Sequence, residues 1–576
     1  MFQLRLINNV RSFSSTSNKK SVLQVPQMGI FKLPEVRNEP KNKFMKGSPE
    51  KAEVKQELNN INSQLNSSGP YKVPMIINGN KIFTQSNKQQ HVPFDHKKIL
   101  CSYSETDKEH IDLAIKTALE AKLSWENMPF NDRAAIFLKA ADLLSTKYRS
   151  KVIAATMMGQ GKTACEAEID AAAELADFWR FNVKYAAEIY SQQPSENSPH
   201  VWNRLEYRPL EGFVVAFSPF NFTAIGGNLC TAPALMGNVV LWKPSPMSMY
   251  SNYLLMQILK EAGLPDGVIQ FIPGDAPFVV ENTFNHPEFA GLHFTGSTAV
   301  FKHLWKKIGD NLEIYKSYPR IVGETGGKNL HFLHKSADVN TAVYNTIRGG
   351  FEFQGQKCSA TSRVYIPESL WPQYSELLKN EVLKIKQGSV EDFSNFMSSV
   401  INRQSFDKIK SYIDEVKEVK DGKQYILVGG ETNDKVGYEI QPTVIVTKDP
   451  FSKTMTDELF GPVVTCYVYP DEKYIETLEM ADKTTDYALT GSVFAVDREA
   501  IITASNVLRN SAGNFYINDK STGAVVGQQP FGGGRSSGTN DKAGSILNLF
   551  RWISPRTIKE NFVPLTRWNY ESNMES

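Results

Sequence analysis

Three short segments, far apart in the chain, contain residue types that together could attack a carbonyl carbon. Cys358 precedes Ser359 and follows a Gly- and Gln-containing run that predicts a flexible loop. A neighbouring cation and backbone donors in such a loop would favour the nucleophilic thiolate. Glu324 lies where an apolar run meets a glycine turn, and Asn221 follows another apolar run. These residue types supply a nucleophile, a general base and an oxyanion donor, which covalent carbonyl chemistry requires.

Each of these residues also has a simpler explanation when it is considered alone. A single cysteine is commonly a small buried apolar group. An asparagine commonly forms a turn, and a glutamate commonly forms a surface ion pair. The five cysteines are odd in number and lack the spacing of metal ligands, so the sequence predicts a reduced compartment and no metal site. None of these three explanations accounts for all three residues in a fixed order.

Six motifs occur along the chain in the order SPFNF, LWKPSP, FTGS, GETGGKN, GQKCS and ELFGPV, between residues 218 and 463. In this order they resemble the aldehyde dehydrogenase superfamily, and the resemblance extends from about residue 74 to residue 555. The longer strings FQGQKCSATSR and GQQPFGGGRSSGTNDKAG resemble the branch of that family that oxidises L-glutamate γ-semialdehyde. Three alternatives remain: an enzyme for another ω-semialdehyde, a coenzyme-A-acylating relative, and a non-catalytic scaffold on the same fold.

The resemblance implies NAD as the cofactor. Gly296 and Ser297 follow an apolar run and open a helical stretch, so their N–H groups could hold a phosphate, although no GxGxxG motif is present. Position 246 is proline where several relatives carry a ribose-binding glutamate, so the preference for NAD over NADP is inferred from the family alone. The cofactor-binding residues implied are Ser218, Lys243, Gly296, Ser297, Thr298, Ala299, Val300 and Glu458.

The resemblance also implies a site for the amino-acid end of the substrate. Backbone N–H groups of Gly523 and Ala524 and the hydroxyl of Ser359 would bind its carboxylate. The rings of Phe222 and Phe531 would enclose the aliphatic middle. Cys358, Glu324 and Asn221 keep the catalytic roles that their residue types suggest.

Alternating strand and helix patterns must position these residues. Helical periodicity predicts helices over residues 107–126, 131–148, 166–190, 338–352, 370–388 and 403–418. Short apolar runs predict strands over 213–217, 239–242, 268–272 and 292–294, and Asn78-Gly79 predicts a hairpin between residues 76 and 83. This alternation predicts an α/β fold with a doubly wound parallel sheet. By resemblance, the fold is a Rossmann-type cofactor domain, an α/β catalytic domain and a small oligomerisation element.

Composition and pattern divide the chain into five parts. Residues 1–20 are basic, contain no acid and are amphipathic, which is typical of a mitochondrial transit peptide; a disordered N-terminus is the alternative. Residues 21–70 are polar and predict an extended arm. Residues 71–191 and 212–320 are expected to form the cofactor domain, and residues 321–539 the catalytic domain. Residues 192–211 and 540–576 are expected to form the oligomerisation element.

Charge and hydropathy limit the partners. The chain has 64 Lys and Arg against 62 Asp and Glu, so no strong field favours a nucleic acid. No apolar run is long enough for a membrane span, so membrane insertion is not expected. We expect a small-molecule substrate, a mitochondrial matrix location and a homodimer or higher homo-oligomer. Trp552, Trp568 and Tyr570 are candidate interface residues.

Overall fold

The short apolar runs in the middle of the chain form a seven-stranded sheet. The computed structural model describes residues 29–85, 88–419 and 422–574. The chain divides into residues 1–33 and residues 34–576, and all the described helices and strands lie in the second unit. The strand order of this first sheet is β11-β10-β7-β8-β9-β2-β3. Its parallel strands are β7 (Phe213–Phe217), β8 (Val239–Lys243), β9 (Ile269–Phe271), β10 (Phe289–Thr295) and β11 (Arg320–Glu324).

The edge of this sheet is the predicted hairpin. Strands β2 (Met75–Ile77) and β3 (Asn80–Ile82) pair antiparallel across Asn78 and Gly79. Both turn residues have positive φ, 49° and 77°, which Asn-Gly tolerates better than most pairs of residues. The Asn-Gly signal in the sequence therefore identified this turn correctly.

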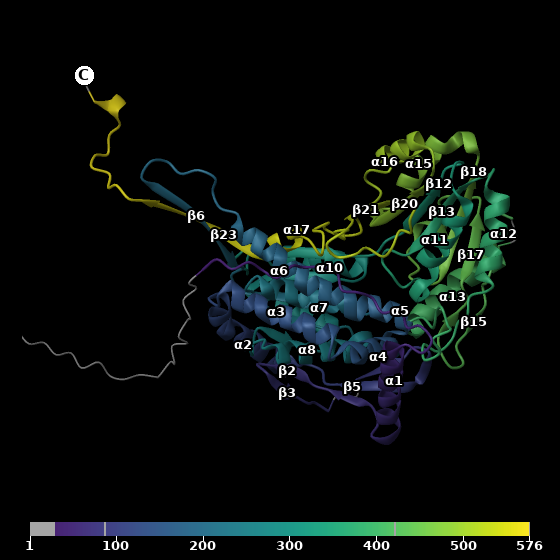
Figure 1. The fold of residues 1–576 in the computed structure, drawn as a ribbon, viewed down its shortest axis with the longest axis horizontal. Helices are drawn as coiled ribbons and strands as arrows, with labels where there is room; N and C mark the ends of the chain where they lie inside the picture. Colours follow the sequence, from purple (N-terminus) through teal and green to yellow (C-terminus); the bar gives the residue numbers. More distant parts are fainter. Residues whose placement is uncertain (1–28, 86–87, 420–421, 575–576) are drawn as a thin grey trace, which may run out of the picture. The chain divides into compact units, whose positions relative to one another are not determined.

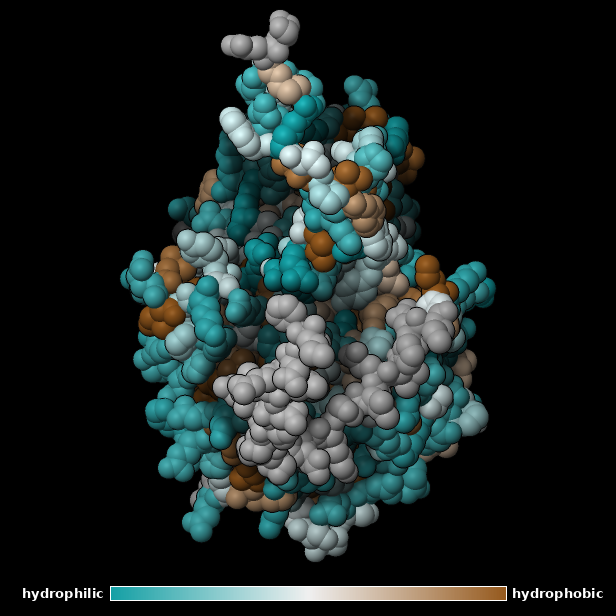
Figure 2. Space-filling model, turned by 90° about the vertical axis from the view of Figure 1, so that its left-hand side faces the viewer, coloured by the Kyte–Doolittle hydropathy of each residue, from teal (hydrophilic) through white to brown (hydrophobic). Residues whose placement is uncertain are grey.

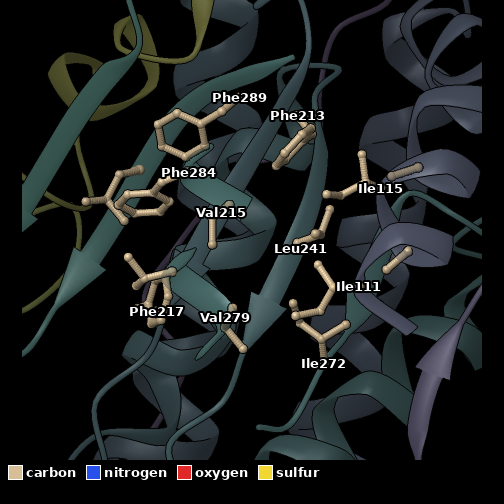
Figure 3. Packing of buried hydrophobic residues seen from close by; sticks show 14 of the residues in the cluster. Ile111, Ile115, Phe213, Val215, Phe217, Leu241, Ile272, Val279, Phe284 and Phe289 are labelled. Carbon is tan, nitrogen blue, oxygen red and sulfur yellow. The ribbon is translucent and has the colours of Figure 1, made fainter. Parts of the chain in front are cut away.

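Helices cover both faces of the first sheet. On one face, α2 (Lys108–Glu126), α9 (Ala276–Phe284) and α10 (Thr298–Asp310) pack on strand residues that include Phe213, Val215 and Phe217. Figure 3 shows Ile111 and Ile115, one helical turn apart on α2, pointing toward these strands. The remaining helices around this sheet are α3 (Phe130–Ser145), α4 (Arg149–Gln160), α5 (Ala164–Ala167), α6 (Leu175–Ser191), α7 (Thr223–Leu235) and α8 (Met249–Ala262).

A second seven-stranded sheet has the order β14-β17-β18-β13-β12-β20-β21. All of its neighbouring strands are parallel except the edge strand β14 (Gln424–Val428). The other strands are β12 (Asn329–Leu333), β13 (Thr361–Pro367), β17 (Thr443–Thr447), β18 (Val463–Tyr469), β20 (Thr490–Phe494) and β21 (Asn514–Ile517). Its helices are α11 (Val339–Phe351), α12 (Trp371–Val382), α13 (Arg403–Glu418), α15 (Tyr474–Lys483) and α16 (Arg498–Val507). Two parallel sheets with helices confirm the α/β fold class.

Two distant segments form an isolated antiparallel ribbon. Strand β6 (Val201–Pro209) pairs along its whole length with β23 (Ile553–Asn561). Figure 1 shows this ribbon extending away from the helices around α6, and Figure 2 views the face from which it projects. Large apolar side chains on and after the ribbon, including those of Trp202, Leu565 and Trp568, are exposed. Trp552, in contrast, is fully buried and contacts His293, so the expectation that it anchors an interface is wrong.

Two sequence-based boundaries differ from the structure. Within the predicted extended arm, residues 49–67 form helix α1 (Pro49–Ser67), which packs on α4. Its single buried stripe is Val54, Leu58 and Ile61, and the many polar residues around this stripe obscured its helical period. The first sheet also continues past residue 320, because β11 pairs with β10 up to Glu324.

Candidate active site

Cys358 lies in a tightly held loop between a 3-10 turn (Glu352–Gly355) and β13. Phe353 and Gln354 both have left-handed backbone angles, with φ of 52° and 54°, which are strained for residues other than glycine. The Gln354 side chain holds this turn in place through the carbonyls of Gly161 (3.0 Å) and Ser399 (2.8 Å) and the N–H of Ser398 (2.9 Å). The prediction that this run is flexible is therefore wrong.

The backbone of Cys358 is fixed by the start of β12. The Asn329 amide donates to the carbonyls of Cys358 and Ala360, both at 2.8 Å. Gly327 lies so close that a Cβ built on it would be 2.4 Å from the Cys358 carbonyl oxygen. Both residues belong to the GETGGKN motif, but the sequence alone assigns them no role. The contacts of the Asn329 amide and of Gly327 with the Cys358 carbonyl become visible only in the folded structure, where the two segments lie together.

The surroundings of Cys358 favour the protonated thiol over the thiolate. Burial raises its pKa, as do the nearby carboxyls of Glu324 and Glu458, and the N–H groups of Ser359 and Cys358 act in the opposite direction. The neighbouring Lys357 ammonium is engaged by Glu352 at 3.0 Å. The cation adjacent in sequence therefore pairs with a carboxylate and does not supply the charge expected at the sulfur.

Asn221 reaches the same loop from the carboxyl end of β7 in the first sheet. It directly precedes the cap of α7, is buried, and its Nδ2 donates to the Gln356 carbonyl at 3.0 Å. Because Gln356 is two residues before Cys358, the structure places the amide of Asn221 beside the cysteine loop. The predicted pairing of nucleophile and oxyanion donor is thus geometrically possible.

A buried ion pair that sequence reasoning missed supports Asn221. Asp170 accepts from the N–H groups of Thr223 (3.0 Å) and Ala224 (2.8 Å), so it caps α7. Lys162 donates to Asp170 at 2.7 Å. The Lys162 ammonium lies 4.0 Å from the Phe222 ring centroid and 4.5 Å from that of Phe353.

The segment that carries Asp170 has an irregular helical pattern. Residues Glu168–Glu174 form a π-helical stretch between α5 and α6, where the sequence predicted one continuous helix over 166–190. Such π-helical insertions are often found at functional sites. Four acids close together in an otherwise Ala-rich helix, Glu166, Glu168, Asp170 and Glu174, were the available signal.

Glu324 ends β11 in a nearly closed environment. Its Oε2 is buried and has no hydrogen-bond partner in the described part of the chain. Burial raises the carboxyl pKa well above its usual value, while the N–H of Gly533 and the charge of Lys542 lower it. A carboxyl acts as a base only after it loses its proton, so the raised pKa should make the chemistry of Glu324 depend on pH.

The predicted cofactor residues lie at the carboxyl ends of the first sheet and beside the cysteine loop. Ser218 follows β7 and accepts from Trp242 Nε1 at 3.0 Å, and Lys243 ends β8. Burial lowers the Lys243 pKa to about 8. Glu458 accepts from the Gly327 N–H at 2.9 Å, so it lies beside the nucleophile loop.

The predicted phosphate site is the N-terminus of α10. Gly296 directly precedes the Ser297 cap, whose hydroxyl accepts from the Val300 N–H at 3.4 Å. Ala299 and Val300 are exposed in the first turn. The Thr298 hydroxyl donates to the Ser536 carbonyl at 3.2 Å, so this side chain points toward the Ser536 segment.

Three of the five predicted substrate residues, Ser359, Gly523 and Ala524, meet at the loop of residues 521–529, whereas the Phe222 ring lies against Lys162. The hydroxyls of Ser359 and Thr522 share a hydrogen bond of 2.7 Å, and the Ser521 hydroxyl donates to the Ser359 carbonyl at 3.1 Å. Gly523 has φ of +93°, which few side chains tolerate, and Ala524 follows it. Phe531, just past the loop, pairs its backbone with Ala543 at 2.8 and 3.1 Å.

Two cavities adjoin these residues. One of about 690 Å³ runs along α10 and shares only Thr298 with the predicted site residues, so it does not coincide with the catalytic group. A second, of about 20 Å³, is lined by Gly327, Lys357 and Glu458 beside the cysteine loop. Within the described residues, no cluster of three or more His, Cys, Asp or Glu is arranged to hold a metal ion.

Comparisons with known proteins agree on one family. The model of the "Aldehyde dehydrogenase family" matches residues 83–557. A delta-1-pyrroline-5-carboxylate dehydrogenase of Agaricus bisporus is 56% identical over 549 residues, covering 95% of this chain and 99% of the relative. The mitochondrial enzyme of that name from Homo sapiens is 49% identical over 536 residues, covering 93% and 94%. The Mycobacterium tuberculosis enzyme, crystallised with NAD, has a TM-score of 0.91 at 45% identity and covers 95% and 100%.

Proposed function

The chain belongs to the aldehyde dehydrogenase family, and from that premise we propose that it oxidises L-glutamate γ-semialdehyde to L-glutamate with NAD. This semialdehyde forms from 1-pyrroline-5-carboxylate, and the reaction is the second step of proline degradation. Support comes from relatives at 49–59% identity that carry the name delta-1-pyrroline-5-carboxylate dehydrogenase. The observation that carries the proposal is the position of the Cys358 loop, which Asn221 contacts on one side and the 521–529 loop on the other.

The side chains of Lys243 and Glu458 and the first turn of α10 have the hydrogen-bonding groups that binding of NAD requires. The Lys243 ammonium, largely buried at a strand end, is suited to donate to ribose hydroxyls, and Glu458 is suited to accept from them. The first turn of α10 presents N–H groups that have no partner within the helix, as a phosphate requires. When bound, NAD accepts the hydride that leaves the former aldehyde carbon. Glu458 and Lys357 of the Cys358 loop line the same small cavity.

The chain's own residues would perform the covalent steps. Cys358, once deprotonated, attacks the aldehyde carbon and forms a hemithioacetal. The Asn221 amide, which donates one of its two hydrogens to the Gln356 carbonyl, and the Cys358 N–H would stabilise its oxyanion. Loss of hydride leaves a thioester on Cys358. Glu324 would then remove a proton from the water that hydrolyses this thioester, releasing the carboxylic acid and the thiol.

The 521–529 loop would select the substrate. Gly523 allows close backbone approach, so its N–H and that of Ala524 could donate to the distal carboxylate. The Ser359 hydroxyl already lies in this loop's hydrogen-bond network. Phe222 and Phe531 would contact the methylene groups between the two ends. A site built in this way rejects aldehydes that lack the amino-acid end, because its donors are then left unpaired.

NADH formation by the purified enzyme across a panel of ω-semialdehydes and simple aldehydes tests this function. Glutamate semialdehyde should have the highest kcat/KM, and Cys358→Ala should abolish NADH formation while the protein stays folded and binds NAD. Preference for another semialdehyde would favour the first alternative. Product formation only with coenzyme A would favour an acylating relative, and no turnover with any aldehyde would favour a scaffold.

The mitochondrial matrix is the proposed location. Relatives from Dictyostelium discoideum, Emericella nidulans and Homo sapiens are named mitochondrial, and residues 1–20 carry the basic, acid-free pattern of a transit peptide. These residues lie outside the described part of the chain. A reporter fused to residues 1–40 should enter the matrix, and the same fusion with Arg5→Glu and Arg11→Glu should not. Cytosolic signal from the unaltered fusion would refute this location.

A homo-oligomer is the proposed assembly. The β6–β23 ribbon and the residues after it expose Trp202, Leu565 and Trp568, and aromatic residues are enriched in protein interfaces. Light scattering coupled to size-exclusion chromatography would test this assembly. A monomer at micromolar concentration would refute it.

In the described residues, no helix is both long and apolar enough to cross a bilayer.

A further inference from the structure

The segment before α1 is bound firmly along its length to the rest of the protein. We refer to residues 35–44 as the N-terminal strap. Figure 1 shows this segment, in purple, running past α6 on its way to α1. Glu39 is held between Arg149 and Arg180, each at 2.6 Å, and all three side chains are largely buried. Farther along, the N–H of Asn42 donates to the Glu168 carboxylate at 2.7 Å.

Asn38 connects this strap to the loop that follows β21. Both hydrogens of its amide are used, because Nδ2 donates to Asp177 Oδ2 and to the Val526 carbonyl, each at 2.8 Å. Its Oδ1 accepts from Gln528 Nε2, also at 2.8 Å. The Asp177 carboxylate, on α6, also accepts from the Glu39 N–H at 2.7 Å. One side chain therefore joins the strap, helix α6 and two positions of the 521–529 loop.

The loop is also held by α6 itself. Gly527 has φ of +82°, and a Cβ built on it would lie 2.3 Å from the Phe181 ring, so the backbone rests directly on that ring. Val526 is buried, and the Val525 N–H donates to Gln529 Oε1 at 2.9 Å. Residues 526–528 thus contact Asn38 or Phe181 at each position. The N–H groups of Gly523 and Ala524 lie within three residues of Val526, so their direction depends on this clamp.

We propose that Asn38 is a positioning residue for the amino-acid end of the substrate, because it fixes the 521–529 loop whose N–H groups bind that end. The N-terminal strap is then part of the specificity machinery of the enzyme. This inference rests on the proposed role of the 521–529 loop. It adds a group that never touches the substrate and comes from a segment nearly 500 residues away, the separation of Asn38 and Val526 being 488 residues.

Asn38→Ala tests the inference, with Asn42→Ala as its matched control. Both variants remove one amide from the same strap, but Asn42 is held through its main-chain N–H, which alanine keeps. Loss of the two loop contacts of Asn38 should raise KM for glutamate semialdehyde about tenfold. The kcat for this substrate and both parameters for pentanal should stay within about twofold of the unaltered enzyme. Asn42→Ala should leave every parameter unchanged.

Hydrogen exchange of the 521–529 amides supplies a readout that needs no substrate. These amides should exchange faster in Asn38→Ala and at the unaltered rate in Asn42→Ala. Gln528→Ala, which removes one contact from an exposed side chain, provides a milder variant if Asn38→Ala does not fold. It should shift exchange and KM in the same direction by a smaller factor.

The possible outcomes separate the inference from the proposed function. Faster loop exchange together with a selective rise in KM supports the inference. Unchanged exchange, an unchanged KM, or equal losses for pentanal and glutamate semialdehyde would overturn it. If the unaltered enzyme shows no preference for glutamate semialdehyde over pentanal, the proposed function fails. In that case, amide hydrogen exchange of residues 521–529 in Asn38→Ala still decides whether Asn38 holds the loop.

Discussion

Substituting Gly327 by alanine should damage catalysis by displacing Cys358. Gly327 needs no unusual backbone angle, so the effect comes from space alone. A Cβ at this position would lie 2.4 Å from the Cys358 carbonyl oxygen and 2.8 Å from Asn329 Oδ1. Real Cβ atoms essentially never approach other atoms closer than 3.0 Å, so the two backbones must separate by about 0.6 Å. The Cys358 carbonyl and the Asn329 side chain, which would clash with this Cβ, are joined by a hydrogen bond that holds the Cys358 loop in place.

The size of the effect follows from this displacement. Misplacing a reacting group by about 1 Å can cost about a hundredfold in rate. A shift of about 0.6 Å at the nucleophile should therefore lower kcat by about ten- to thirtyfold. Overpacking should also lower the free energy of unfolding by about 1–3 kcal/mol, which leaves a protein of this size folded. NAD affinity should change little, except through the Gly327 N–H that donates to Glu458.

Steady-state NADH formation, NAD titration and thermal unfolding would measure these changes. The matched control is Gly534→Ala, since a Cβ built on Gly534 meets no atom within 4 Å and its φ is not positive. That variant should match the unaltered enzyme in rate and stability. The reasoning would be refuted if folded Gly327→Ala kept kcat within twofold of the unaltered enzyme, or if Gly534→Ala lost as much.

Two further predictions concern buried charges. Because burial raises the pKa of Glu324, its basic form is populated only as the pH rises toward that pKa, so thioester hydrolysis should accelerate with increasing pH. Glu324→Gln should flatten this pH profile and leave a single-turnover burst of NADH followed by slow turnover; an unchanged steady-state rate would contradict the role of Glu324 as base. Lys162→Met should lower the free energy of unfolding by about 3–5 kcal/mol, because it leaves the Asp170 carboxylate buried without its cation. Adding Asp170→Asn should recover part of that loss in urea titrations, and a double variant no more stable than the single one would contradict this account.

The elements with a clear hydrophobic period could be predicted from the sequence. Strand β7 was predicted at its observed bounds, 213–217, because both faces of a parallel strand are buried and the run is continuously apolar. Helix α13 was also predicted at its observed bounds, 403–418, because its buried residues recur at helical spacing beside a polar face. Such signals are local, so a single sequence suffices to read them.

The candidate site could be predicted only as a list of residues. Cys358, Asn221 and Ser359 belong to recognisable motifs, but the contacts that hold them are long-range. Asn221 meets Gln356 across 135 positions and Ser359 meets Thr522 across 163. The stiffness of the cysteine loop was missed for the same reason. Glycine and glutamine in sequence are compatible with flexibility, and only the partners of Gln354 make the turn rigid.

The N-terminal segment shows why polarity alone misleads. The polar composition of residues 21–70 predicted an extended arm, because a segment with few apolar residues cannot form its own core. Yet the strap needs no core of its own, since it satisfies groups that the rest of the protein buries. Glu168 and Asp177 lie on the inner faces of a helical segment, where an unpaired carboxylate is costly, and their partners include Arg149, Asn38 and the backbone of the strap. Buried acids in an otherwise apolar helix therefore indicate that some other polar segment must cover them. In this protein that segment is the strap, and the same hydrogen bonds that satisfy Asp177 extend through Asn38 to the 521–529 loop.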